Sequence, residues 1–194
     1  MTQWFKDSRA SKIKIEKARK NKDWATVKSA TVALHNANKM RIALTKNGRR
    51  VQVLETHEDV DLVVNDGKYL MRPPLVGRNA ADLQALLDRE GVSCIVLCRE
   101  PKTQLGFCPI VILGDTTTVR SQVGEPTNPN KPTVKWFDSA TDELGRTVLD
   151  KKDTFATNDR KLDYLLGHLS AVPVCDGLYF AIVEICDALL DANE

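Results

Sequence analysis

The sequence predicts an α+β fold with an N-terminal basic helical arm, an antiparallel sheet built from two tight hairpins plus core strands, and C-terminal helices. Three observations support this prediction. Positive charge is concentrated in the first 50 residues, two Gly-containing turns are flanked by apolar residues, and apolar residues recur at helical spacing near both ends of the chain. We expect a basic helical arm over residues 1–40 and an α+β core domain over residues 41–194.

Composition sets the broad class of the protein. The 194 residues include 42% apolar and 28% charged side chains, as in a globular chain that can bury one sizeable core. No apolar run approaches the roughly 18 residues of a membrane span, and residues 1–7 lack the features of a secretory signal. We therefore expect a cytoplasmic protein with no membrane contact, whose five cysteines are reduced thiols.

Two helices are expected in the arm. Asp7 or Ser8 can begin a helix that continues from about residue 9 to residue 20. Asp23 can begin a second helix, in which Trp24, Val27, Thr31, Leu34 and Ala37 recur at helical spacing.

Two hairpins are expected next. Residues 41–54 contain Asn47-Gly48, which suits the type I′ turn of a tight hairpin. Residues 61–72 contain Asp66-Gly67 and would pair in the same way. The two hairpins would form a meander of about four antiparallel strands.

The remainder of the chain is expected to form three helices, three strands and two irregular sections. A helix over 80–90 precedes two apolar strands, 92–98 and 107–113, which would set Cys98 opposite Cys108. A long loop over 115–132, a strand over 133–137 and an acidic, turn-rich section over 138–153 follow. Asn158 can cap a helix that continues to residue 168, and Asp176 can cap a last helix that continues to residue 190. This order is not the alternating βαβ pattern of a nucleotide-binding sheet.

The net charge of +2 is the sum of two opposed parts. Residues 1–50 hold fourteen Lys and Arg against three Asp and Glu, a balance of +11, and the remaining 144 residues have a balance of −9. Residues 12–22 alone carry six positive charges. Such a segment neutralises phosphates and releases counterions, so it binds nucleic acid without sequence preference.

The sequence thus favours a non-enzymatic accessory or assembly protein that binds nucleic acid, or an acidic protein surface, electrostatically. The predicted nucleic-acid-binding residues are Lys12, Lys14, Lys17, Arg19, Lys20, Lys22, Arg41, Lys46, Arg49 and Arg50. Two simpler explanations stand beside this one: the cations pair with acids of the same fold, or they form a solvated face.

A structural, oligomer-forming protein is the alternative function. The opposed charges of the two parts are self-complementary, so the basic arm could dock on the acidic surface of a neighbouring subunit. Trp4, Phe5 and Trp24 would then be the apolar anchors of the interface.

No motif in the sequence names a reaction, and we assign no catalytic residue, cofactor or metal site. Glu100-Pro101-Lys102 follows an apolar strand, as the acidic-x-Lys pair of metal-dependent nucleases does. In such an enzyme Glu100 would bind Mg²⁺ or Mn²⁺ and Lys102 would stabilise negative charge, with Asp88 as the candidate second acid. The competing interpretation is a polar turn between two strands.

Overall fold

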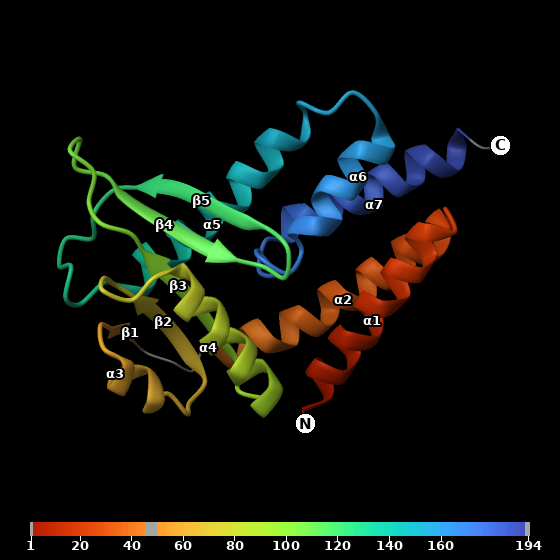
Figure 1. Cartoon of the computed structure of the whole chain (residues 1–194). Coiled ribbons are helices and arrows are strands. Elements are labelled where there is room, and N and C mark those ends of the chain that lie inside the picture. Colours follow the sequence, from red (N-terminus) through yellow and green to blue (C-terminus); the bar gives the residue numbers. More distant parts are fainter. Residues whose placement is uncertain (1, 46–49, 193–194) are drawn as a thin grey trace.

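The computed structural model describes residues 2–45 and 50–192. Within these ranges the chain forms seven helices and one five-stranded mixed sheet. The fold is therefore α+β overall, as the sequence predicts. Figure 1 shows the sheet on one side of the molecule and a group of long helices on the other.

The first two helices are longer than predicted. Helix α1 (Gln3–Lys20) and helix α2 (Trp24–Thr45) pack side by side, joined by a short turn in which Lys22 has a φ of 55°. Asp23 caps α2 as predicted, because its carboxylate accepts a hydrogen bond from the Thr26 N–H at 3.0 Å. The prediction of a separate basic arm is not confirmed, since Ile15 and Leu34 belong to the main apolar cluster of the fold.

The first predicted hairpin is wrong in its leading strand. Residues 41–45 continue helix α2, and strand β1 (Val51–Leu54) pairs with another strand in parallel. The Asn47-Gly48 turn lies outside the described residues. A buried Arg41 on the helix donates to the Cys94 carbonyl at the start of strand β3 (Cys94–Arg99), a long-range contact that the local turn signal does not report.

The second predicted hairpin is also wrong. Helix α3 (His57–Asp61), capped by Thr56 and Asp59 in a reciprocal capping box, ends where the first strand of this hairpin is predicted to begin, and residues 62–66 form no strand. Strand β2 (Gly67–Met71) is buried along its whole length and pairs in parallel with both β1 and β3. Asp66 does not turn the chain back; its carboxylate accepts a hydrogen bond from the Ser93 N–H at 2.6 Å.

The sheet has the order β1-β2-β3-β4-β5. Helix α4 (Gly77–Glu90) connects β2 to strand β3 (Cys94–Arg99), so β1-α3-β2-α4-β3 does alternate, contrary to the prediction. Strands β4 (Cys108–Leu113) and β5 (Thr118–Val123) extend the sheet in antiparallel fashion. Cys98 pairs with Val111 rather than with Cys108, which pairs with Val123, so the predicted cysteine register is wrong.

Helix α5 (Val134–Lys152) replaces the strand and the turn-rich section that the sequence predicts over 133–153. The Thr133 side chain caps it by accepting a hydrogen bond from the Trp136 N–H at 3.1 Å. Its buried residues recur at helical spacing: Phe137, Ala140, Thr141, Leu144, Gly145 and Val148. The aromatic and β-branched start of the segment concealed that period.

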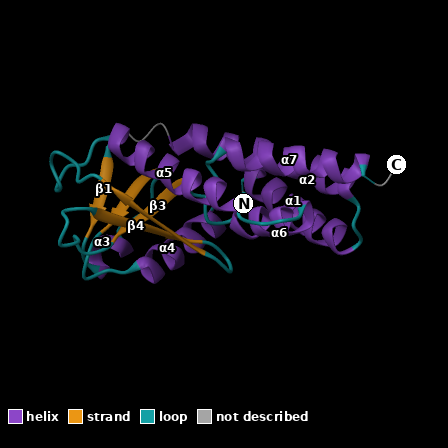
Figure 2. Ribbon diagram, turned by 90° about the horizontal axis from the view of Figure 1, so that it is seen from above, coloured by secondary structure: helices purple, strands orange, loops and turns teal. Residues whose placement is uncertain are grey.

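Helix α6 (Asn158–His168) and helix α7 (Asp176–Asp191) begin and end within one residue of their predictions, but their N-caps are Thr157 and Cys175 rather than the predicted Asn158 and Asp176. Helices α1, α2, α6 and α7 extend away from the sheet in Figure 2. One face of the sheet packs on α4, and the other face joins α5 and these helices in the larger apolar cluster. Among the described helices, none combines the length and the apolar composition that crossing a bilayer requires.

Candidate functional site

Helix α1 has a buried inner face and a charged outer face. The inner face consists of Trp4, Ser11, Ile15 and Ala18. We define the outer face of α1 as the exposed residues Lys6, Arg9, Ile13, Lys17 and Lys20.

The outer face of α1 is a row of free cations. Residues spaced three, four and seven positions apart share one side of a helix, and fourteen residues at 1.5 Å each give the row a length of about 21 Å. Within the part of the chain that the structure describes, Lys6, Arg9, Lys17 and Lys20 have no acidic partner. Two of these four, Lys17 and Lys20, belong to the predicted nucleic-acid-binding set.

Lys14 and Lys22 lie exposed beside this row. Lys14 is close enough to Asp23 to affect its titration. Hydrogen bonds from Thr26, and secondarily the charge of Lys14, lower the pKa of Asp23. These two lysines therefore extend the positive surface toward the turn between α1 and α2.

Other cations of the predicted nucleic-acid-binding set pair with acids of the same fold, which is the first of the two simpler explanations given above. Arg19 donates to the Asp163 carboxylate at 2.5 and 2.9 Å, and its guanidinium lies 4.9 Å from the centre of the Trp24 ring. Lys12 is 3.6 Å from the Asp115 carboxylate. The chain thus divides its basic residues between internal pairing and solvent.

The structure corrects the placement of Arg41. The sequence predicts it on the exposed face of a hairpin, but it lies on α2 with 7% of its surface exposed. Arg50 is exposed just before β1, while Lys46 and Arg49 lie outside the described residues.

The predicted interface anchors are mostly covered within the chain. Trp4 and Trp24 are each only 4% exposed. Phe5 is half-buried and contacts Trp4 edge to face, with ring centres 5.9 Å apart. In this structure neither tryptophan is presented to a partner.

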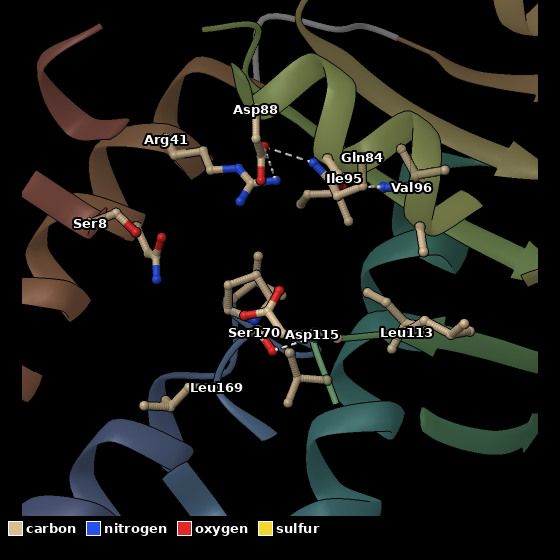
Figure 3. A pocket seen from close by; sticks show the side chains of 18 of the residues that line it. Ser8, Arg41, Gln84, Asp88, Ile95, Val96, Leu113, Asp115, Leu169 and Ser170 are labelled. Atoms are coloured by element: carbon tan, nitrogen blue, oxygen red, sulfur yellow. Dashed lines mark hydrogen bonds and ion pairs between the residues drawn. The ribbon is translucent and has the colours of Figure 1, made fainter. Parts of the chain in front are cut away.

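A cavity of about 360 Å³ lies beside the start of α1. Its walls come from α1, α2, α4, α5, the start of β3, the end of β4 with the two residues after it, and the segment 169–174. Several residues singled out in the sequence meet there, among them Trp4, Phe5, Lys12, Arg41 and Asp88. Figure 3 shows Arg41 and Asp88 on one side of this cavity, with Asp115 and Ser170 across from them.

Arg41 and Asp88 form an ion pair at 3.0 Å. The same nitrogen of Arg41, Nη2, also donates to the Cys94 carbonyl at 2.6 Å, and Gln84 donates to Asp88 Oδ1 at 2.9 Å. Burial raises the pKa of the Asp88 carboxyl, and the charge of Arg41 opposes that shift. The pair is held on rigid elements, with Arg41 on α2 and Asp88 on α4.

Glu100, Lys102 and Asp88 do not come together. Glu100 accepts two hydrogen bonds from Arg120, at 2.8 and 2.6 Å, whereas Lys102 donates to Glu125 at 2.6 Å. Asp88 lies with Arg41 at the opposite end of β3. The described residues contain no group of three or more His, Cys, Asp and Glu side chains placed to hold a metal ion.

Sequence reasoning missed Gln84 altogether and assigned Asp88 to a different chemistry. No local signal identifies them, because their position beside Arg41 depends on how α2 packs against α4. Comparison with protein-family models, with curated proteins and with solved structures gives no match for this chain. The geometry of the cavity and of the outer face of α1 is therefore the basis for assigning a function.

Proposed function

We propose that this protein binds nucleic acid without sequence preference through the outer face of α1. The observation that carries the proposal is the row of Lys6, Arg9, Lys17 and Lys20, exposed and without acidic partners among the described residues. Each cation that meets a phosphate releases a condensed counterion, which favours binding.

The local charge supports the same surface. Helix α1 carries seven Lys and Arg against two acids, Asp7 and Glu16. Asp7 accepts a hydrogen bond from Gln3 at 2.8 Å and does not pair with a cation of the row. A length of about 21 Å allows the row to follow several successive phosphates of a strand. The contacts would position the polyanion, and base edges would not be read by these lysines.

The test is a salt titration of binding. Fluorescence anisotropy would give the affinity of the full chain for a single-stranded and a double-stranded oligonucleotide over a series of salt concentrations. A variant in which Lys6, Arg9, Lys17 and Lys20 are all changed to Gln should lose at least about tenfold in affinity for the duplex. Its log–log salt slope should become shallower by roughly 3 to 4, because four phosphate contacts are removed.

A matched control keeps the same net charge. Four exposed cations elsewhere, Arg89, Lys131, Lys135 and Lys151, are changed to Gln instead. This control should bind like the wild type. Equal loss in both variants would show that total charge, and not the outer face of α1, drives binding. No binding of either oligonucleotide at low salt would overturn the proposed function.

A further inference from the structure

The cavity beside α1 contains polar groups that the fold leaves unsatisfied. Arg41 uses only Nη2, and its Nε and Nη1 groups donate to no acceptor in the described residues. The Oδ2 atom of Asp88 likewise accepts no hydrogen bond from them. Only Nε is fully buried with its hydrogen bond unmade, which is costly, whereas Asp88 keeps 26% of its side chain exposed. Because Arg41 and Asp88 both line the cavity, Nη1 and Oδ2 are the atoms of this pair that we take to bond a ligand.

The charges of the cavity favour an uncharged, hydrogen-bonding ligand group over a simple anion. Arg41 is already neutralised by Asp88, so its free N–H groups lie beside a free carboxylate oxygen. A ligand that satisfies both must present a hydrogen-bond acceptor next to a donor. The hydrogen-bonding edges of nucleobases have this arrangement.

The walls and rim of the cavity suit the rest of a nucleotide. Phe5 lines it and is half-buried, and aromatic side chains are the usual surfaces on which unpaired bases stack. Trp4 supports this wall from behind, since it is only 4% exposed and packs against Phe5 and Arg41. Arg9 and Lys12 also line it, and Arg9 belongs to the outer face of α1 as well. A volume of 360 Å³ falls in the range of small-molecule sites, which begins at about 300 Å³.

We infer that this cavity receives one unpaired nucleobase from a single strand whose phosphates lie on the outer face of α1. Arg41 Nη1 donates to a ring or carbonyl acceptor of the base, and Asp88 Oδ2 accepts from a neighbouring N–H. Arg9 joins the two parts of the site, since it serves both the cavity rim and the row of cations. This inference rests on the proposed function and adds to it a preference for unpaired bases.

Two strands separate the inference from the proposed function. One is a single-stranded oligonucleotide of about twelve nucleotides, and the other has the same phosphodiester backbone without bases. The full-length protein should bind the strand with bases at least about fivefold more tightly, as expected when one base is stacked and bonded. Equal affinity for the two strands would overturn the inference and leave the proposed function standing. Failure to bind either strand would overturn both.

A variant that fills the cavity tests whether the preference for a strand with bases arises there. Ala85 lines the cavity but is exposed on α4, so Ala85→Phe should block the entrance without disturbing the core. We expect this variant to bind both strands with the lower affinity of the abasic strand. Ala33→Phe, on an exposed position of α2 that does not line the cavity, is the control and should behave like the wild type. A preference for bases that survives Ala85→Phe would place base binding elsewhere and contradict the inference.

Discussion

The two ends of strand β3 carry charged clusters that differ in how completely their groups are bonded. At the start of the strand, Arg41 and Asp88 border a cavity and retain free donors and a free acceptor. At its end, Arg99 and Lys102 both donate to Glu125, at 2.9 and 2.6 Å. One cluster has capacity for a ligand, and the other has its charges paired within the fold.

The difference reverses the usual expectation for parallel strands, whose ligands bind beyond the carboxyl ends. Here ion pairs occupy the carboxyl ends of β1, β2 and β3. Arg72, which follows β2, pairs with Glu55 after β1 and donates to the Pro129 carbonyl at 2.9 Å. These contacts hold the segment around residue 129 over the carboxyl ends of the strands. The cavity lies instead beside the start of β3.

The largest expected effect comes from breaking the buried pair at the start of β3. Arg41→Met should lower the free energy of unfolding by about 3–5 kcal/mol, because it leaves the Asp88 carboxylate largely buried without its partner. Urea unfolding at neutral pH measures this loss. Arg120→Met removes an exposed arginine that pairs with Glu100, just after the end of β3, and should cost less than about 1 kcal/mol. Similar losses in the two variants would remove the contrast between the two ends.

An intermediate effect is expected at the end of β3. The Arg99 side chain is mostly buried, but Glu125 keeps a second partner in Lys102 when Arg99 is changed. Arg99→Met should therefore lower the free energy of unfolding by about 1–2 kcal/mol. The same urea experiment measures it, and a loss as large as that of Arg41→Met would show that the two clusters are equally critical.

The smallest effect is a difference in pH dependence. Burial raises the pKa of Asp88, whereas hydrogen bonds from Lys102 and Arg99 lower the pKa of Glu125. The folded chain therefore binds protons at Asp88 more tightly than the unfolded chain does, and the contribution of Asp88 to stability falls as pH rises above about 4. The contribution of Glu125 has the opposite sign: it is present above its unfolded pKa and is lost as pH falls through its lowered folded pKa.

Two variants check these signs. Urea unfolding of the wild type, Asp88→Asn and Glu125→Gln is followed between about pH 3 and 6. The stability of the wild type relative to Asp88→Asn should decrease with rising pH, and its stability relative to Glu125→Gln should increase. If the two differences change in the same direction, the two carboxyl groups do not have the opposed environments described above.

Local signals in the sequence were sufficient for much of the helical structure. The start of α2 follows from the capping signal at Asp23, and the approximate extents of α6 and α7 follow from the 3.6-residue period of apolar side chains. The concentration of positive charge before residue 50 is likewise a property of the sequence alone.

Strand direction and burial were decided by the tertiary structure. Asp66-Gly67 has the local form of a hairpin turn, but β2 gains more by pairing on both edges and burying all five of its residues between β1 and β3. Arginine is a residue type that is usually exposed. Arg41 is nevertheless buried, because α2 continues far enough for it to meet the Cys94 carbonyl and Asp88. Helix caps and periods act over a few residues and can be predicted from them. Strand pairing, the Arg41 ion pair and the cavity beside it join residues far apart in the chain, so only the packed fold determines them.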